Sequence, residues 1–265
     1  MSAPANADLR GQHAIVTGGG RGIGAAIALA LAQQGARLTL MGRTAATLDG
    51  NAAALRTQFG AQVNTAVCDV AQPTDVVRAF SDAARALGEP QILINNAGQA
   101  AAAAFDAIPL ETWNRLIAVN LTGTFLCTQQ VLPSMARAGY GRIVNVASTA
   151  GLKGYSGLAA YCTTKHGVVG LTRALAVEAA RANVTVNAVC PGYTEDTEMF
   201  AAALGNVMRT TGVSADEARA RLTRGSLRRT AITPQEVAHT VAWLCSPEAT
   251  AITGQAIAVA SGEVM

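Results

Sequence analysis

The stretch HAIVTGGGRGIG, residues 13–24, decides the fold of this chain. Its apolar beginning (13–18) predicts a strand, and apolar residues recur at helical spacing from Gly22 to Gln34. Glycines between a strand and a helix let the backbone approach a pyrophosphate, whose charge is stabilised at the helix N-terminus. A glycine-rich turn also occurs as a purely structural device. Its position between the first strand and the first helix favours dinucleotide binding.

The same alternation of strand and helix continues along the chain. Further strands are predicted at 37–42, 62–70, 91–98, 141–148, 184–192 and 256–260, and further helices at 45–58, from Pro73, at 111–138 and at 155–182. This order predicts right-handed βαβ units, and so an α/β, Rossmann-type doubly wound parallel sheet of about seven strands with helices on both faces. Because there is no linker or repeat, we expect residues 1–265 to form a single dinucleotide-binding and catalytic domain.

One interval is irregular. Between Gly192 and Ile232 no strand is predicted, and only a short helix is indicated, by the capping box that Ser214 forms with Glu217. A second capping box, over 233–236, opens the next helix. A long excursion at the carboxyl end of a parallel strand is where an active-site lid lies. We therefore predict a substrate lid over about 193–232.

The composition excludes several classes of protein. The net charge is only +3, and basic residues are dispersed among acidic ones, so we expect no nucleic-acid partner. No apolar stretch is long enough to span a bilayer, and the polar first residues do not resemble a signal peptide. The five cysteines are widely spaced without a CxxC pair, which favours reduced core thiols over disulfides or metal ligands. We expect a cytoplasmic protein without a metal site.

The end of the second predicted strand bears on the choice of cofactor. Proteins that prefer NAD usually carry an acidic residue there, which bonds the ribose 2′-hydroxyl. This chain has Gly42 followed by Arg43, with Arg21 in the glycine-rich turn. Two cations and no acid suit a 2′-phosphate. NADPH is therefore the preferred cofactor and NADH the alternative, and the less favoured interpretation of Arg43 is an exposed loop residue.

Tyr161 and Lys165 are candidates for proton transfer. They lie four residues apart in a predicted helix and so share one face. Ser148 ends the preceding strand, at the sheet edge where ligands bind. A nearby lysine cation lowers the pKa of a phenol, so Tyr161 can exchange a proton with a carbonyl oxygen that Ser148 holds. Alone, the spacing is equally compatible with a half-buried tyrosine beside a solvated lysine.

At this point the sequence strongly resembles the short-chain dehydrogenase/reductase family over essentially its whole length. The matching elements are TGGGRGIG at 17–24, CDV at 68–70, NNAG at 95–98, NLTG at 120–123, Ser148, YCTTK at 161–165 and PG at 191–192. The text around 148–178 looks like the 3-oxoacyl and polyketide ketoreductase branch. The resemblance implies an NAD(P)-dependent enzyme that interconverts a ketone and a secondary alcohol, and a homotetramer or homodimer that packs through the helices at 111–138 and 155–182.

The resemblance also implies roles for individual residues. The catalytic set is Asn120, Ser148, Tyr161 and Lys165, with Asn120 holding a water that links Lys165 to solvent. The predicted cofactor-binding residues are Thr17, Gly18, Gly20, Arg21, Gly22, Ile23, Gly24, Arg43, Asp69, Val70, Asn96, Ala97, Gly98, Tyr161, Lys165, Pro191, Gly192 and Thr194. The stretch after Gly192 is one residue longer than the family pattern. Whether Thr194 or Thr197 faces the cofactor therefore stays open.

The substrate is the least determined feature. Its walls are expected from 99–106, 149–158 and 193–232, with Ser148, Tyr155, Tyr161 and Tyr193 as contacts. A 3-ketoacyl thioester or another bulky carbonyl compound is the first hypothesis, with some arginines of the excursion meeting carrier phosphates; ordinary surface ion pairs are the alternative for those arginines. Two other functions remain open. One is an NAD-dependent dehydrogenase of small or cyclic secondary alcohols, and the other is a non-catalytic nucleotide-binding protein on the same fold.

Overall fold

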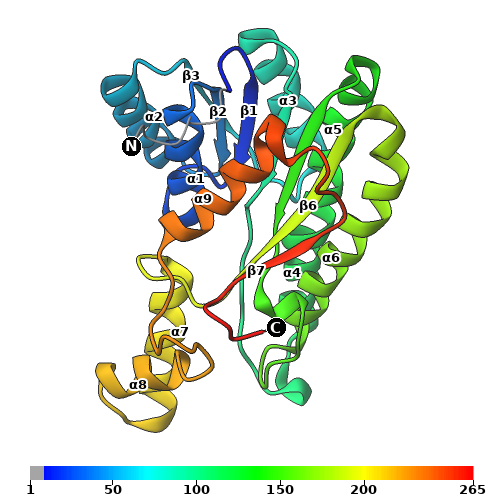
Figure 1. The fold of residues 1–265 in the computed structure, drawn as a ribbon. Coiled ribbons are helices and arrows are strands. Elements are labelled where there is room, and N and C mark those ends of the chain that lie inside the picture. The colour runs from blue at the N-terminus through cyan, green and yellow to red at the C-terminus, as the bar shows by residue number, and fades with distance from the viewer. Residues whose placement is uncertain (1–8, 265) are drawn as a thin grey trace.

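A seven-stranded parallel sheet forms the centre of the computed structural model, which describes residues 9–264 (Figure 1). The strands are β1 (His13–Thr17), β2 (Arg37–Gly42), β3 (Val63–Val67), β4 (Ile92–Asn95), β5 (Gly141–Val146), β6 (Val184–Pro191) and β7 (Ala256–Val259). Their order across the sheet is β3-β2-β1-β4-β5-β6-β7. The predicted doubly wound fold is therefore confirmed. Most of the polar amino-terminal stretch, residues 1–8, lies outside the described residues.

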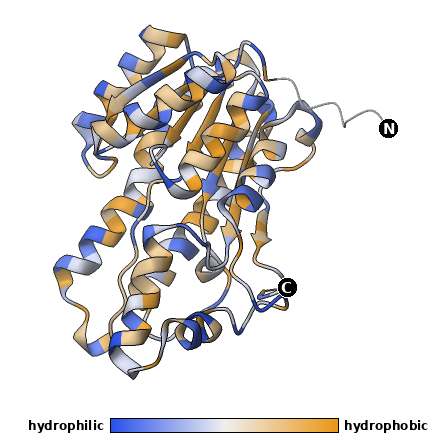
Figure 2. Cartoon of the chain, turned by 90° about the vertical axis from the view of Figure 1, so that its left-hand side faces the viewer, coloured by the Kyte–Doolittle hydropathy of each residue, from blue (hydrophilic) through white to orange (hydrophobic). Residues whose placement is uncertain are grey.

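Helices cover both faces of the sheet. One layer contains α1 (Gly22–Gln33), α2 (Ala45–Phe59) and α9 (Pro234–Cys245), and the other contains α3 (Pro73–Leu87), α4 (Leu110–Leu116), α5 (Gly123–Ala138) and α6 (Ala159–Ala179). Each layer has its own apolar core against the strands. Figure 2 shows the strands as the most hydrophobic part of the cartoon, because both of their faces are covered.

The order of the strands locates a binding crevice. β1 pairs with β2 on one side and with β4 on the other, so the chain reverses its direction of winding between β1 and β4. In open α/β sheets, ligands bind outside the carboxyl ends of the strands at such a switch point. The glycine-rich turn follows β1 and lies at this edge.

The structure corrects two predicted helices. The helix expected at 111–138 is interrupted by a π-helical turn, Ile117–Thr122, between α4 and α5. π-turns inside α-helices are frequent at functional sites. The helix expected from Tyr155 begins only at Ala159, since Gly157 has a left-handed φ of +75° and Tyr155 lies in the preceding loop.

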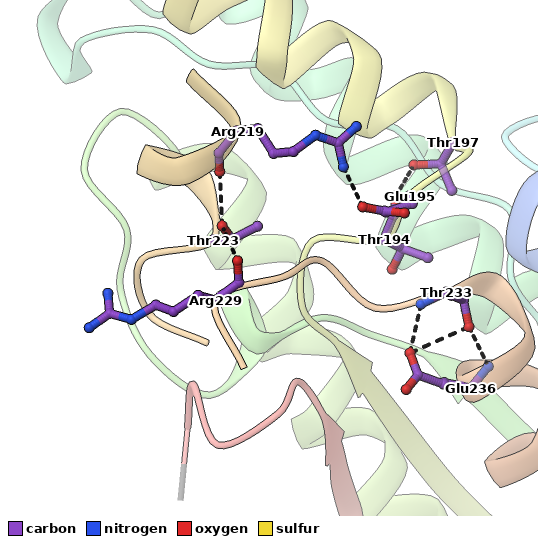
Figure 3. A network of polar contacts seen from close by, with 8 residues as sticks. All are labelled: Thr194, Glu195, Thr197, Arg219, Thr223, Arg229, Thr233 and Glu236. Carbon is purple, nitrogen blue, oxygen red and sulfur yellow. Dashed lines mark hydrogen bonds and ion pairs between the residues drawn. The ribbon is translucent and has the colours of Figure 1, made fainter. Parts of the chain in front are cut away.

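The excursion between β6 and α9 contains more helix than the sequence indicated. α8 (Ala215–Leu222) is the expected short helix, capped by Ser214, but α7 (Glu198–Thr211) was missed. Both helices lie beyond the sheet edge in Figure 1. A single bridge, Thr194 with Ile232, joins the two ends of the excursion. Figure 3 shows the polar contacts that hold it, among them the ion pair of Arg219 with Glu195 and the capping box at the start of α9.

Two further sequence predictions concern burial. All five cysteines are buried free thiols, as expected. Among residues 9–264, no helix combines the length and the apolar character needed to cross a membrane.

Candidate active site

The glycine-rich turn between β1 and α1 is tightly packed. Gly18 and Gly22 have left-handed φ angles of +66° and +52°, which glycine adopts without strain. The turn is fastened from two sides. The Asn96 side chain donates to the carbonyl oxygen of Thr17 at 2.9 Å, and the Asn51 side chain donates to that of Gly19 at 2.7 Å. Sequence reasoning missed Asn51, which no motif marks.

The first turn of α1 suits a phosphate. No side chain caps its N-terminus, and its first turn carries no acidic residue, so its free N–H groups are available to an anion. A Cβ on Gly22 would meet only the Thr197 side chain, at 3.4 Å, so the backbone is open to a close approach. The cradle therefore fits the pyrophosphate of a dinucleotide.

Gly24→Ala tests this packing. A Cβ on Gly24 would lie 2.1 Å from the carbonyl oxygen of Gly18 and 2.6 Å from Nδ2 of Asn96, so the turn must open. We expect a loss of about 3 kcal/mol in the free energy of unfolding, measured by denaturation, together with weaker dinucleotide binding. Gly50→Ala in α2 is the matched control, because its Cβ would meet nothing within 4 Å. Equal stability of the two variants would refute the packing argument.

The two cations predicted to bind a 2′-phosphate lie in different settings. Arg43 follows Gly42 at the end of β2, is exposed, and forms no ion pair within residues 9–264. Arg21 forms an ion pair with Glu198 at the start of α7. Arg43 is therefore available to an anion, whereas Arg21 has a competing carboxylate.

The residues predicted beside the adenosine follow β3 and β4. Asp69 is half-buried and its carboxylate accepts from the N–H of Ala71 at 3.0 Å, whereas Val70 is buried. The N–H groups of Asn96 and Ala97 both donate to the Thr17 hydroxyl at 3.0 Å, and this fastens the end of β4 to β1. These contacts bring the predicted segments to one edge of the sheet.

Asn120 lies in the π-turn and is buried. Its side-chain oxygen accepts from the N–H of Gln99 at 2.8 Å, and its amide donates to the Gln99 carbonyl and to the Thr164 hydroxyl. The side chain thus joins the loop after β4 to α6. A Cβ on Gly98 would lie 3.3 Å from Oδ1 of Asn120 and 3.6 Å from Nζ of Lys165, so these two predicted residues share one neighbourhood.

Ser148 and Tyr161 converge from β5 and α6. Ser148 follows β5, and its hydroxyl accepts from the N–H of Ala150 at 3.1 Å. Tyr161 is almost fully buried, and burial raises the pKa of its phenol to about 12, against the opposing effect of a hydrogen bond with the Ser148 side chain. At neutral pH the phenol is therefore protonated and able to donate.

Lys165 is buried one helical turn after Tyr161. Its Nζ donates to the carbonyl oxygen of Val146 at 2.8 Å and lies 5.7 Å from the centre of the Tyr161 ring. Burial lowers the pKa of Lys165 to about 8. The expected lowering of the Tyr161 pKa is not found, because desolvation of the buried phenol is the largest influence and raises that pKa.

The segment after β6 contains the two candidate threonines. Thr194 is buried, and its hydroxyl turns back to the Gly192 carbonyl at 3.1 Å. The Thr197 side chain lies near Gly22, since a Cβ on Gly22 would be 3.4 Å from it, and Thr197 also caps α7. Asp196 takes a left-handed φ of +55°, which accommodates the additional residue before Thr197. Of the two threonines, Thr197 is therefore the one placed near the glycine-rich turn.

The first turn of α7 lies near both the glycine-rich turn and Tyr161. A Cβ on Gly22 would be 3.4 Å from the Thr197 side chain, Glu198 pairs with Arg21, and Sδ of Met199 lies 3.8 Å from the Tyr161 hydroxyl. Three consecutive residues thus approach the glycine-rich turn and Tyr161. Sequence reasoning missed Met199 because α7 was not predicted.

The predicted substrate contacts lie beside Tyr161. Tyr155 packs against the cluster that contains Tyr161, and Tyr193 stacks obliquely on Phe200 at 6.1 Å between ring centres. Ion pairs occupy three arginines of the excursion: Arg219 with Glu195, Arg221 with Glu217 and Arg228 with Glu236. For these three arginines, the structure therefore contains ordinary surface ion pairs, the alternative to contacts with carrier phosphates. Arg224 has no carboxylate within 4.0 Å among the described residues.

Comparison with known proteins decides the family. Residues 12–206 match the family described as short chain dehydrogenase. The chain belongs to this family. An acetoacetyl-CoA reductase of Shinella zoogloeoides is 38% identical over 252 residues, which cover 94% of this chain and 97% of the relative. A 2-(S)-hydroxypropyl-CoM dehydrogenase of Xanthobacter autotrophicus is 37% identical and covers 96% and 97%.

A solved structure resembles this short-chain dehydrogenase closely. It is a crystal structure of a substituted actinorhodin polyketide ketoreductase with NADPH, with a TM-score of 0.91 and 38% identity over 95% of this chain and 97% of that chain. The predicted family, its ketoreductase branch and the NAD(P)-dependent oxidoreductase class, which interconverts ketones and secondary alcohols, are confirmed. The roles of individual site residues stay predictions.

Proposed function

We propose that this short-chain dehydrogenase is an NADPH-dependent ketoreductase in which Tyr161 donates a proton to the carbonyl oxygen of the substrate. The observation that carries the proposal is the convergence of Ser148, Tyr161 and Lys165 at the carboxyl edge of the sheet, beside the dinucleotide cradle. Such a set has no purpose in a protein that only binds a nucleotide.

Each of the four predicted catalytic residues has a different proposed role. When bound, NADPH supplies a hydride. Tyr161 is protonated at neutral pH, the form that reduction requires, and Ser148 stabilises the oxygen on which negative charge develops. The Lys165 amine, held by the carbonyl of Val146, keeps a positive charge near the phenol below a pH of about 8. Asn120 holds the loop after β4 against α6, which supports a positioning role.

The excursion supplies a lid. We infer that residues 193–232 close over the crevice, since the first turn of α7 contacts both the glycine-rich turn and Tyr161. The remaining cofactor-binding residues keep their predicted roles, with Thr197 replacing Thr194 at the cradle. We propose that this lid and the nucleotide half form one catalytic domain.

The proposed assembly is a homotetramer or homodimer. Large apolar side chains are exposed on one helical layer: Leu110 of α4, Phe125 of α5 and Val177 of α6 are 73%, 44% and 79% exposed. Exposed apolar residues on adjacent helices are typical of protein interfaces. A second copy of this chain is therefore the proposed partner for these helices, and the cytoplasm is the proposed compartment.

The preference for NADPH gives a direct test. The guanidinium of Arg43, which is exposed and forms no ion pair within residues 9–264, supports a contact to the 2′-phosphate, which NADH lacks. We expect kcat/KM for NADPH to exceed that for NADH by at least about tenfold, and Arg43→Ala to reduce only the NADPH value, by about tenfold. Arg137→Ala, on α5, is the control.

The substrate class is tested in the same assay. The names of relatives such as the acetoacetyl-CoA reductase support a 3-ketoacyl thioester or another bulky carbonyl compound. A panel of ketoacyl thioesters, simple ketones and cyclic secondary alcohols should therefore show fastest turnover with the thioesters. A clear NADH preference together with oxidation of small alcohols would instead establish the alternative dehydrogenase function.

A further inference from the structure

Glu263 is a nearly buried carboxylate at the edge of the proposed active site. The chain turns sharply after β7, through Ser261 and Gly262 with φ angles of +50° and +78°, and this brings Glu263 back beneath the lid. The turn is fastened to the lid by the N–H of Leu227, which donates to the Ser261 carbonyl at 2.9 Å. The Glu263 side chain is 8% exposed. The turn after β7 and its hydrogen bond to the lid therefore hold Glu263 in place.

The two oxygens of this carboxylate have different surroundings. Oε1 accepts from the Tyr155 hydroxyl at 2.5 Å and lies 3.4 Å from Nζ of Lys153. Oε2 accepts no hydrogen bond from any described residue and lies over Gly192, where a Cβ would be 3.0 Å away. Oε2 is not among the fully buried polar atoms that lack a partner, so this oxygen remains accessible from solvent. Oε2 therefore has the capacity for one more donor.

Glu263 also lines a cavity. It has a volume of about 400 Å³ and is lined by Lys153, Tyr155, Tyr193, Arg224 and Glu263, among others. Tyr155 connects the cavity to the site, because its ring packs against the cluster of Tyr161 and its hydroxyl binds Glu263. Burial and, after it, the negative charge of Glu263 raise the pKa of Tyr193, which also lines the cavity.

The chemistry of the carboxylate selects its ligand. Lys153 lies on the side of Oε1, and Arg221 and Arg224 also line the cavity, whereas Oε2 itself can only accept hydrogen bonds from a donor. We propose that Glu263 is a specificity-determining residue whose Oε2 accepts a hydrogen bond from a hydroxyl group that the ketone substrate carries away from its reacting carbonyl. The preferred substrates are therefore hydroxylated ketones. This inference rests on the proposed ketoreductase function and names its substrate class more narrowly.

The test compares substrates that differ in a single hydroxyl group. The probes are ketoacyl thioesters of N-acetylcysteamine with and without a terminal hydroxyl group, over a series of chain lengths, with NADPH in excess. At the chain length that reaches Oε2, we expect kcat/KM to be about tenfold higher for the hydroxylated member, as one hydrogen bond to a charged group implies. A ratio near one at every length in the wild-type enzyme overturns the proposal without any variant.

Glu263→Gln provides the second measurement. The preference should fall severalfold, because a neutral NH2 group replaces the charged acceptor Oε2, while the plain thioester keeps its kcat/KM within about threefold, because Tyr155 retains an acceptor. Glu248→Gln, an exposed position, is the control and should keep the preference. Unchanged preference in Glu263→Gln with a raised KM for NADPH would assign Glu263 to the cofactor and overturn the proposal.

Failure of the proposed function has a different signature. If no thioester is reduced but simple ketones are, the thioester hypothesis fails, and the same paired comparison is made with hydroxylated and plain simple ketones. A hydroxyl preference there, lost in Glu263→Gln, still supports the role of Glu263. Absence of that preference overturns it.

Discussion

Replacing Tyr161 by phenylalanine is expected to lower kcat/KM for ketone reduction by about a thousandfold, the scale of general acid catalysis. The phenol is the protonated group next to Ser148, and phenylalanine removes its proton while keeping the ring that packs against Ala150 and Cys162. The Kd for NADPH should stay within about threefold of the wild-type value, because removal of the phenol hydroxyl affects proton transfer. Steady-state kinetics and a fluorescence titration of NADPH measure the two quantities.

Tyr140→Phe is the matched control for this variant. Tyr140 precedes β5 at the opposite, amino end of the sheet, where its hydroxyl donates to Gln12 at 3.1 Å. Its removal should leave turnover unchanged. If Tyr161→Phe retained more than about a tenth of the wild-type rate, Tyr161 would not be the proton donor, since a positioned acid contributes at least about a hundredfold.

Replacing Lys165 by methionine is expected to abolish turnover and to stabilise the fold at neutral pH. Burial lowers the pKa of Lys165 from 10.5 to about 8, which means that the folded protein bears an unfavourable buried charge below pH 8. A shift of this size corresponds to about 3 kcal/mol. The variant also loses the hydrogen bond to the Val146 carbonyl, and this loss lowers its free energy of unfolding by about 1 kcal/mol. We expect Lys165→Met to raise the free energy of unfolding by about 2 kcal/mol at pH 7.

The dependence on pH distinguishes this cause from improved packing. Between about pH 8 and 10.5 the unfolded chain binds more protons than the folded one, so the stability of the wild-type protein relative to Lys165→Met rises with pH. The advantage of Lys165→Met should therefore shrink toward zero by pH 10. Denaturation curves of both proteins at pH 7 and pH 10 measure it. A variant that is less stable at pH 7, or an advantage independent of pH, would contradict the buried charge.

The largest elements of the fold follow from local patterns in the sequence. The apolar run of β1, the glycines after it and the periodicity of α1 are contiguous, so their physical constraints can be read along the chain. The same holds for the capping box of Thr233 with Glu236, where two groups three residues apart satisfy each other. Tyr161 and Lys165 share a helical face for the same reason.

The features that the sequence did not predict depend on contacts with residues that are distant in the chain. In the π-turn, the Asn120 side chain donates hydrogen bonds to Gln99 and Thr164, which are 21 and 44 residues away in the chain. Because of the one-residue extension after Gly192, the sequence alone does not distinguish Thr194 from Thr197 as the residue that faces the cofactor. Only the left-handed turn at Asp196 and the position of Gly22 distinguish them. The opposing effect of burial on the pKa of Tyr161 likewise depends on what surrounds it.

The sequence by itself determined the doubly wound sheet and the glycine-rich turn between β1 and α1, because each rests on local patterns or on a strand end whose place in a parallel sheet is known. The group of Ser148, Tyr161 and Lys165 followed from the family order of the sequence motifs, since the spacing of Tyr161 and Lys165 alone is ambiguous. Only the tertiary structure decided that Met199 lies over the Tyr161 hydroxyl and that Glu263 reaches Tyr155 across 108 residues of chain. The physical reason is that side-chain burial and hydrogen bonding depend on distances in space, which a lid and a terminal turn set without leaving a pattern in the sequence.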